Sequence, residues 1–286
     1  MNDFKKYSIN IGGRLHEIDR PQVMGILNVT PDSFFSGSRC GSDDAVIRCR
    51  VKQVIAEGAD MIDIGGYSSR PGADDIPPEE EYARLRKGIA IIREEAPNAV
   101  ISVDTFRADV AKRCVIECGA HIINDISGGD LDSDMFTTVA ELNVPYILMH
   151  MRGTPATMTS LTEYDDVTAD VIADLMAKVS RLKELGVNDI ILDPGFGFSK
   201  TVEQNYEMLR NIHNFVELNL PVLVGISRKS MIYKLLGTSP EESLNGTTVL
   251  NTIALLQGAH ILRVHDVQAA VEAVRIVAAT TGAYKY

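Results

Sequence analysis

The sequence has no tryptophan, only four cysteines, and few aromatic residues of any kind (6%) among its 286 residues. The cysteines are Cys40, Cys49, Cys114 and Cys118, and no two of them form a CxxC pair. This spacing excludes the small disulfide-stapled class of secreted protein. Cys114, Cys118 and His121 leave a metal site open, but reduced packing cysteines fit better, because structural zinc uses four ligands at recognisable spacing.

Long apolar runs and excess positive charge are also missing. No run of about eighteen apolar residues is present, and the first ten residues lack the apolar core of a signal peptide, so we expect a cytoplasmic protein. The net charge of −11 disfavours nucleic acid and anionic membranes as partners. We therefore expect small-molecule substrates, and any anionic substrate must be held by a few well-placed cations.

What the chain does contain is a regular alternation of short apolar runs and amphipathic stretches. The runs are nearly continuous and rich in aliphatic and β-branched residues, which is typical of parallel strands covered on both faces. Eight runs of this kind are found, at residues 23–29, 61–66, 100–105, 121–126, 146–151, 190–195, 222–227 and 261–266.

Helical patterns lie between these runs. Residues 42–44 (Ser-Asp-Asp) can cap a helix that ends near Gly58, and an apolar stripe over 167–185 predicts a helix ending near Gly186. The stretch 239–246 predicts another helix with a serine cap, and a last helix is expected from about residue 267 to residue 280.

Eight strands alternating with helices favour a (β/α)₈ barrel, the TIM-barrel fold, formed by residues 1–286 as a single domain. An open doubly wound sheet is the competing fold, but it would need a glycine-rich dinucleotide turn after an early strand, and the sequence has none. Residues 7–18 predict a β-hairpin with Gly12-Gly13 at its turn, placed to cap the bottom of the barrel.

Polar residues follow the predicted strands, where a barrel of this kind places its active site. Asparagine and aspartate suit a flat heterocycle that offers both donors and acceptors, and a lysine can donate to a ring carbonyl. Polar and cationic side chains at the same rim could surround a phosphate leaving group, together with a hard cation such as Mg²⁺. The residues at these ends are Asn28, Asp63, Asp104, Asn124, Asp193, Lys229, Arg263 and His265.

Structural explanations compete at several of these positions. Asp125 and Asp266 are more typical of structural helix caps, and His150 and His265 could each be satisfied core histidines. The stretch 193–198 (DPGFGF) could be an ordinary turn. The loops at 28–44 and 65–80 are long for this fold, so they predict mobile lids or else ordinary surface loops.

An ordered set of motifs closely resembles the dihydropteroate synthase family. The resemblance covers about residues 22 to 270 and implies a usually dimeric (β/α)₈ barrel in folate biosynthesis. It implies a transferase that condenses 6-hydroxymethyl-7,8-dihydropterin diphosphate with p-aminobenzoate, with loss of pyrophosphate before the amine attacks. The motifs are MGILNVTPDSF (24–34), DIGGYSSRPGA (63–73), SVDT (102–105), NDISGG (124–129), DPGFGF (193–198), GISRKSM (225–231) and RVHDV (263–267).

The resemblance also implies roles for individual residues. Lys229, Asp104, Arg263 and His265 would be the catalytic groups, and Asn28 would reach a Mg²⁺ ion bound to the diphosphate. The pterin would contact Asp104, Asn124, Asp193 and Lys229, with Arg228 across the ring face or tuning its neighbours. The diphosphate would lie among Asn28, Ser69, Arg70, Arg263 and His265, and p-aminobenzoate among Phe34, Pro71, Phe198, Lys229 and Ser230.

The chain departs from the family pattern in its lids, where Tyr67, Ser69 and residues 35–38 replace the usual residues. Two other functions stay open. One is a pterin-binding barrel that transfers a methyl group from methyltetrahydrofolate to a corrinoid protein, which has no need of the residues 227–230 (SRKS) and 263–265 (RVH). The other is an inactive pterin-binding barrel that serves as a partner subunit.

Overall fold

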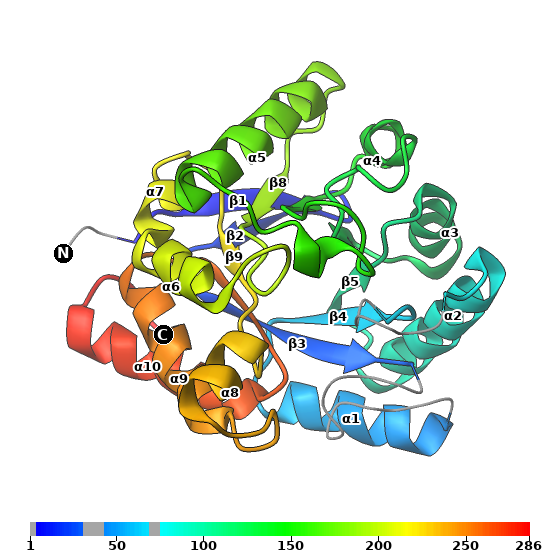
Figure 1. Ribbon diagram of the computed structural model, residues 1–286. Helices are drawn as coiled ribbons and strands as arrows, with labels where there is room; N and C mark the ends of the chain where they lie inside the picture. Colours follow the sequence, from blue (N-terminus) through cyan, green and yellow to red (C-terminus); the bar gives the residue numbers. More distant parts are fainter. Residues whose placement is uncertain (1–3, 31–42, 69–74) are drawn as a thin grey trace.

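The chain folds into a barrel of eight parallel strands with its helices on the outside (Figure 1). The computed structural model describes residues 4–30, 43–68 and 75–286. The strands lie in the order β8-β7-β6-β5-β4-β3-β10-β9, and a parallel bridge between Leu192 and Val222 joins the two outer strands of this order. The predicted (β/α)₈ barrel is therefore confirmed, and the open doubly wound sheet is not formed.

All eight predicted apolar runs form strands, mostly a little shorter than the runs themselves. The strands are almost entirely buried, because helices cover the outer face of the barrel and side chains fill its interior. They are β3 (Gln22–Asn28), β4 (Met61–Gly65), β5 (Val100–Asp104), β6 (Ile122–Asp125), β7 (Tyr146–Met149), β8 (Ile190–Asp193), β9 (Leu223–Val224) and β10 (Ile261–Val264).

The helices largely follow the sequence pattern. The side chain of Asp43 accepts a hydrogen bond from the backbone N–H of Ala45 and so caps the first helix, as predicted. The helices are α1 (Asp44–Ala56), α2 (Pro78–Glu95), α3 (Ala108–Cys118), α4 (Met135–Leu142), α5 (Val167–Glu184), α6 (Val202–Arg210), α7 (Ile212–Val216), α8 (Ser230–Leu236), α9 (Leu244–Leu256) and α10 (Val267–Thr281), with a short 3₁₀-helix at Met158–Ser160.

One predicted helix start is wrong. The sequence placed a serine cap at the start of 239–246, but α9 begins only at Leu244, with Ser243 in the cap position. Ser239 instead lies in a turn, where its hydroxyl and backbone N–H both donate to the carboxylate of Glu242 at 3.2 Å. The early acidic residues that looked like a helix N-terminus thus close a turn before the helix.

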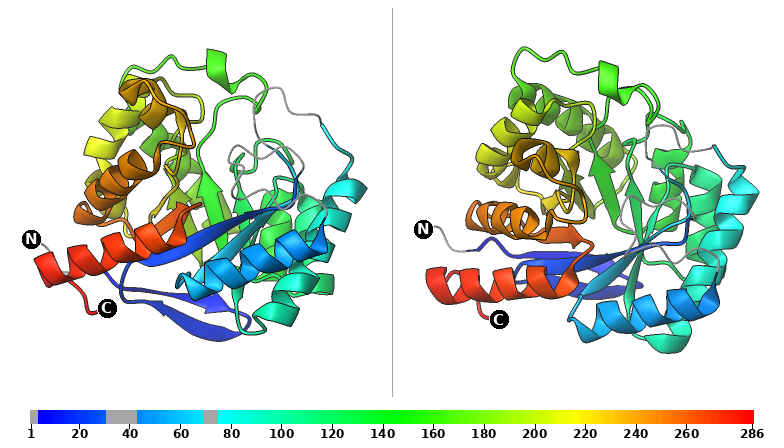
Figure 2. Two further views of the ribbon diagram at one scale, coloured as in Figure 1. Left: turned by 90° about the horizontal axis from the view of Figure 1, so that it is seen from below. Right: turned by 60° about the horizontal axis from the view of Figure 1, so that its bottom comes forward.

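The N-terminal hairpin closes the bottom of the barrel, as predicted (Figure 2). Strands β1 (Tyr7–Ile11) and β2 (Arg14–Ile18) pair antiparallel, and Gly12 and Gly13 form the turn with φ of +57° and +82°. Ile9 and Ile18 pack against the first residues of the barrel strands. Because this end is plugged, the opening to solvent lies at the carboxyl ends of the strands.

Of the two predicted lids, 28–44 and 65–80, residues 31–42 and 69–74 lie outside the described residues. Within the part of the chain that the structure describes, no helix is both long enough and apolar enough to span a bilayer.

Candidate active site

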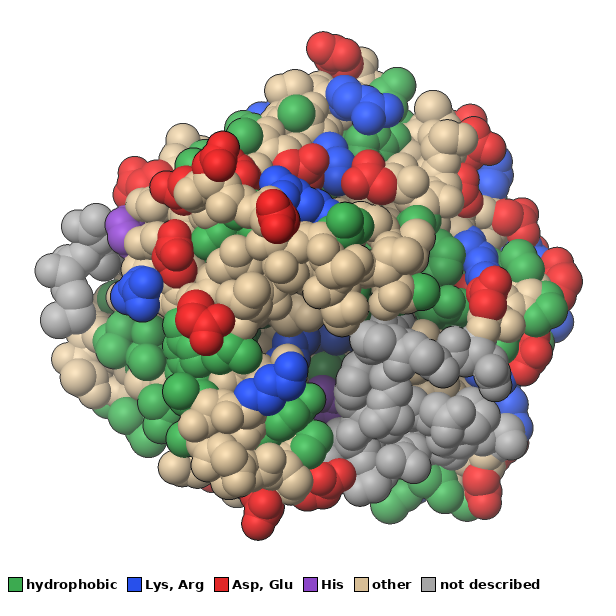
Figure 3. Space-filling model, in the orientation of Figure 1, with side chains coloured by type: hydrophobic (Ala, Val, Ile, Leu, Met, Phe, Trp, Pro, Cys, Tyr) green, Lys and Arg blue, Asp and Glu red, His purple; other side chains and the backbone are tan. Residues whose placement is uncertain are grey.

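A cavity of about 310 Å³ opens at the carboxyl end of the barrel. Figure 3 shows its mouth as a hollow with basic and histidine side chains inside. Four predicted site residues, Phe34, Ser69, Arg70 and Pro71, lie outside the described residues. Asp63, predicted at the end of its strand, lies instead at the centre of β4 and does not line the cavity. The remaining predicted site residues do: Asn28, Asp104, Asn124, Asp193, Phe198, Arg228, Lys229, Ser230, Arg263 and His265.

A network of charged and polar groups forms the floor of the cavity. The Arg263 guanidinium donates to Asp63 through Nε and to Asp104 through Nη2, both at 2.7 Å. The Asn124 amide donates to the same oxygen of Asp63 at 3.0 Å. Burial raises the pKa of Asp104 to about 7; the nearby Arg263 opposes this shift and the carboxylate of Asp63 adds to it. Asp104 therefore titrates near neutral pH.

Lys229 stands at the wall of the cavity between two parts of the loop after β8. Its ammonium group donates to the backbone carbonyl of Phe196 and lies 4.6 Å from the centre of the Phe198 ring. Burial lowers its pKa to about 8, although the carboxylate of Asp193 opposes the shift. Burial raises the pKa of Asp193 in turn, against the effect of Lys229. Lys229 and Asp193 thus place a hydrogen-bond donor beside a hydrogen-bond acceptor at one wall of the cavity.

The loop of residues 193–200 is held from beneath by Lys200, which the sequence analysis missed. The buried ammonium group lies 3.0 Å from His150 Nδ1 and donates to the carbonyls of Gly195 and Phe198 at 3.1 and 3.0 Å. Burial, together with Lys200, lowers the pKa of His150 to about 2, so this histidine is a neutral core residue. The signal was present, because a lysine lies two residues after the glycine-rich motif.

The same loop passes very close to the backbone of the preceding strand. Gly195 has a φ of +73°, and a side chain there would place its Cβ 2.0 Å from the carbonyl oxygen of His150. Only glycine fits this position. The stretch 193–198 is thus more than an ordinary turn, since it is tightly packed between Lys200 below and Lys229 above.

His265 faces the cavity from the end of β10. Its Nδ1 lies 3.0 Å from the hydroxyl of Ser227, whose oxygen also accepts a hydrogen bond from the His265 backbone N–H. Burial lowers its pKa to about 3, and the neighbouring cations, Arg263 first among them, act in the same direction. The imidazole is therefore neutral at physiological pH and can donate a hydrogen bond without adding charge.

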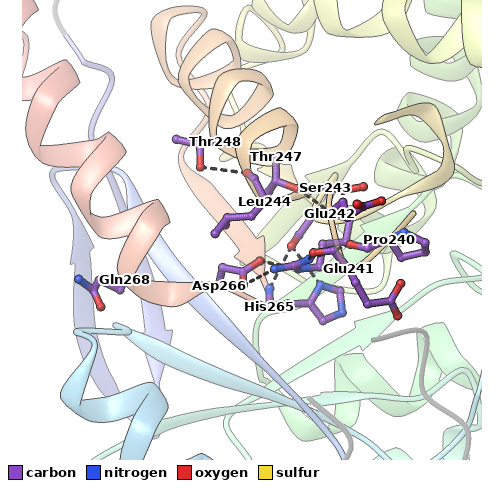
Figure 4. A network of polar contacts seen from close by, with 12 residues as sticks. Pro240, Glu241, Glu242, Ser243, Leu244, Thr247, Thr248, His265, Asp266 and Gln268 are labelled. Atoms are coloured by element: carbon purple, nitrogen blue, oxygen red, sulfur yellow. Dashed lines mark hydrogen bonds and ion pairs between the residues drawn. The ribbon is translucent and has the colours of Figure 1, made fainter. Parts of the chain in front are cut away.

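Arg228 lines the cavity and is held by several partners. Its guanidinium forms a two-point ion pair with Asp266, at 2.8 and 2.9 Å, and donates to the carbonyls of Pro240 and Glu241 (Figure 4). The planar guanidinium is held by these partners at the cavity, next to Lys229 in the chain. The two roles expected for Arg228, across the ring face or tuning its neighbours, stay predictions.

The two aspartates expected to be structural are so, although neither acts simply as a helix cap. Asp266 precedes α10 but bonds Arg228, with no side-chain bond to the helix N-terminus. Asp125 is fully buried and accepts hydrogen bonds from the backbone N–H groups of Ser127 and Gly129 and from the Tyr146 hydroxyl. Asp125 holds the turn after β6 below the cavity.

An apolar wall at the cavity mouth was also missed. Met149 ends β7 and could have been recognised as a strand-end residue, but Met158 comes from a long loop that carries no local signal. These side chains pack with Ile126 and the Phe198 ring in one cluster. Tyr67 adds an aromatic edge, because its ring meets Phe106 at a centroid distance of 5.0 Å.

Within the described residues, no group of three or more His, Cys, Asp or Glu side chains is arranged to hold a metal ion. Cys114 is buried in the core, where desolvation raises the pKa of its thiol. The Cys118 sulfur lies 3.7 Å from the Tyr82 hydroxyl. These contacts explain both cysteines as packing residues.

A (β/α)₈ barrel with carboxylates, an amide and a lysine at its open end fits the class of pterin-binding barrel enzymes, and the family model of pterin-binding enzymes matches residues 24–265. The chain belongs to this family, within it to the dihydropteroate synthases, which are transferases. It is 44% identical to the dihydropteroate synthase of Escherichia coli K12 over 93% of this chain and 94% of that one.

Solved structures agree with this assignment. The Yersinia pestis dihydropteroate synthase, crystallised with a sulfonamide drug, superposes with a TM-score of 0.91 at 38% identity, over 96% of this chain and 100% of that one. The Xanthomonas albilineans enzyme, crystallised with 4-aminobenzoic acid, gives a TM-score of 0.87 at 37% identity, over 96% of this chain and 98% of that one.

Proposed function

We propose that the cavity catalyses the dihydropteroate synthase reaction of folate biosynthesis. The C–O bond that joins the pterin methylene to its diphosphate breaks, a C–N bond to p-aminobenzoate forms, and the amine loses a proton. The products are 7,8-dihydropteroate and pyrophosphate. The polar floor below an apolar, aromatic wall supports this function, in a chain 44% identical to a dihydropteroate synthase over nearly its whole length.

The pterin ring is proposed to bind against the floor and the Lys229 wall. Asp193 is a carboxylate acceptor for adjacent ring and amino N–H groups, and Lys229 is a donor for a ring carbonyl. Asn124 and Asp104 complete the set of donors and acceptors at the floor. Arg228 is assigned here the shaping of the Lys229 segment through Asp266.

The diphosphate is proposed to leave toward Arg263 and His265. Arg263 keeps its positive charge, because the carboxylates of Asp63 and Asp104 raise its pKa against the effect of burial. The neutral His265 supplies a hydrogen-bond donor beside it. Electron donation from the pterin stabilises the cationic methylene, so pyrophosphate departs before the amine attacks. Ser69 and Arg70 were predicted at this position and lie outside the described residues.

The residues present fit a Mg²⁺ ion held mainly by the substrate. Asn28 Oδ1 and Asp104 Oδ2 lie 3.5 and 3.8 Å from the point that a Cβ on Gly65 would occupy, so two side-chain oxygens lie near the carboxyl end of β4. Mg²⁺ prefers oxygen ligands, keeps several waters and is commonly bound by one or two protein oxygens together with phosphates. Asn28 is the proposed protein ligand. When bound, the ion neutralises charge on the leaving group.

The p-aminobenzoate is proposed to bind at the mouth, beside Phe198, Lys229 and Ser230. The Phe198 ring and Met158 give the benzene ring an apolar surface, and Lys229 offers a cation above that surface. Phe34 and Pro71, the two predicted lid contacts, lie outside the described residues. This arrangement brings both substrates to Lys229.

A homodimer and a cytoplasmic location complete the proposal. Exposed apolar side chains gather on α8, α9 and α10, toward the lower left of Figure 3, and a second copy is the occupant we propose for this face. The exposed side chains of this face are Leu235, Leu236, Leu244, Val249, Leu256 and Ile276. Sedimentation that shows a monomer at micromolar concentration would refute the dimer.

The cytoplasmic location agrees with the state of the cysteines. Cys49, Cys114 and Cys118 are free thiols, as in a reducing compartment.

The test is pyrophosphate release from 6-hydroxymethyl-7,8-dihydropterin diphosphate with Mg²⁺, with and without p-aminobenzoate. We expect release that depends on p-aminobenzoate and yields dihydropteroate. Tight pterin binding without turnover would favour an inactive barrel that serves as a partner subunit. In the same assay, Lys229→Ala should abolish turnover and weaken pterin binding; unchanged pterin binding would remove this lysine from the pterin site.

A further inference from the structure

Asp63 is a buried carboxylate that borders no part of the cavity and yet contacts two residues that do. It is 0% exposed at the centre of β4. One of its oxygens, Oδ2, accepts hydrogen bonds from Arg263 Nε at 2.7 Å and from Asn124 Nδ2 at 3.0 Å. Both donors line the cavity. A single oxygen therefore joins a residue at the proposed pterin position to one at the proposed diphosphate position.

The barrel register explains how these three side chains meet. Asp63 pairs with Ile26 of β3 on one side and with Ser102 of β5 on the other. Arg263 and Asn124 lie one strand further out in each direction, on β10 and β6. Alternate strands of a barrel send side chains into the same interior layer, so β10, β4 and β6 bring these groups together.

We propose that Asp63 is a positioning residue that sets the orientation of the Asn124 amide and of the Arg263 guanidinium for the two halves of the pterin diphosphate. This inference rests on the proposed function for the identity of the substrate. An ionised carboxylate can only accept hydrogen bonds, and an amide has one donor end and one acceptor end. Because Nδ2 of Asn124 is bound to Asp63, its carbonyl oxygen is left for the cavity.

Asn124 therefore selects a ring edge that offers an N–H group, and it disfavours an edge that offers a lone pair. Arg263 is fixed in the same way. Its Nε and Nη2 are bound to Asp63 and Asp104, which leaves the Nη1 side of the guanidinium for an anion in the cavity. Asp63 thus determines both a recognition element for the heterocycle and the direction from which the diphosphate is held.

The test replaces the carboxylate with an amide of the same shape, Asp63→Asn. The new side chain keeps one oxygen that can accept both hydrogen bonds, but it removes the negative charge and puts an N–H donor in place of Oδ1, so both donors are held more weakly. We expect KM for the pterin diphosphate to rise about tenfold or more, and inhibition by pyrophosphate to weaken by a similar factor. KM for p-aminobenzoate should change less than about twofold, because neither Asn124 nor Arg263 lies at the proposed aryl pocket.

Asp125→Asn is the matched control. Asp125 is as deeply buried as Asp63, undergoes the same substitution, and bonds only the turn and the Tyr146 hydroxyl below the cavity. It should lower the melting temperature without raising KM for the pterin diphosphate. Asp63→Asn with a lowered melting temperature and unchanged KM and pyrophosphate inhibition would overturn the proposal, because Asp63 would then be a purely structural residue.

The double variant Asp63→Asn with Asn124→Asp carries the same test if the single variant does not fold. Its exchanged side chains restore a donor and an acceptor between these two positions and again leave an acceptor for the cavity, while Arg263 Nε loses its acceptor. We expect KM for the pterin diphosphate within about threefold of the wild type and pyrophosphate inhibition still weakened, since the charge facing Arg263 has moved. If KM for the pterin diphosphate and inhibition by pyrophosphate change together in the double variant, the result would count against the proposal.

Thermal-shift binding of 6-hydroxymethyl-7,8-dihydropterin and of pyrophosphate, each alone, separates this inference from the proposed function. Neither measurement requires turnover. Wild-type binding that weakens in Asp63→Asn supports the positioning role even in a chain that makes no dihydropteroate. Wild-type turnover with equal binding in both proteins would contradict the positioning role and leave the synthase function intact.

Discussion

At the residue scale, two ionisable groups in the cavity titrate near neutral pH because burial penalises their charged forms. The pKa of Asp104 is raised to about 7, so its contribution to stability is present at low pH and lost as the pH rises through about 7. The pKa of Lys229 is lowered to about 8, so its contribution is present at high pH and lost as the pH falls through about 8. Both groups therefore reduce the stability of the ligand-free chain near neutral pH.

The same shifts predict the pH dependence of catalysis. Below about pH 7 Asp104 takes up a proton and weakens its ion pair with Arg263, and above about pH 8 Lys229 loses its positive charge. Since kcat/KM reports the free enzyme, we expect kcat/KM for the pterin diphosphate to peak between about pH 7 and 8 and to fall on both sides. Steady-state rates from about pH 5.5 to 9.5 measure this profile.

Asp104→Asn provides the control for that profile. The variant keeps the shape of the side chain but cannot ionise, so the acidic limb should shift or disappear while the alkaline limb stays in place. An acidic limb with the same midpoint in the variant would assign that titration to another group.

At the element scale, the loop after β8 connects the two proposed substrate positions. It carries Asp193 at the pterin side and Phe198 at the mouth, and the ammonium of Lys200 holds its carbonyls from inside the barrel. A buried carbonyl that loses its donor is left unsatisfied, which costs about 1–3 kcal/mol. The loop therefore depends on one buried cation for its conformation.

Lys200→Met tests this dependence, because methionine keeps the apolar stem and removes the donor. We expect the free energy of unfolding to fall by about 2–4 kcal/mol and KM for p-aminobenzoate to rise several-fold, since two carbonyls lose their partner. Urea unfolding and initial rates measure the two effects. Lys183→Met, at an exposed position near the end of α5, should change stability by no more than about 0.5 kcal/mol. Equal behaviour of the two variants would argue against the role of Lys200.

At the scale of the whole molecule, the barrel has two ends with different tasks. The N-terminal hairpin packs apolar side chains against the first residues of the strands and closes one end, while the last residues of the strands form the cavity at the other. The residues that stabilise the fold and the residues of the proposed active site thus lie at opposite ends of the barrel, as is general for this fold.

Two substitutions in one hairpin strand separate these tasks. Ile18→Ala removes a fully buried side chain from the plug and should lower the free energy of unfolding by about 2–4 kcal/mol. Leu15→Ala, three residues away and 80% exposed, should change it by no more than about 0.5 kcal/mol. Chemical unfolding checks both values. Each variant should keep the wild-type kcat/KM below its unfolding transition; a large loss of activity in Ile18→Ala would show that the two ends are coupled.

The barrel, the hairpin and most of the residues around the cavity could be predicted before the structure was known. These follow from local signals: continuous apolar runs, their alternation with amphipathic stretches, and polar residues such as Asn28, Asp193 and His265 at the run ends. Because parallel strands in a closed barrel end at one rim, a position in the run was enough to place a side chain near the site.

The contacts of the individual side chains could not be predicted and are seen in the folded chain alone. Arg228 pairs with a residue 38 positions away, Lys200 turns inward to three acceptors, and Met158 reaches the cavity from a long loop. Asp63 lies beneath the floor and orients Asn124 from two strands away. These partners depend on the stagger of the closed barrel and on the direction of each side chain, neither of which is encoded in the neighbouring sequence.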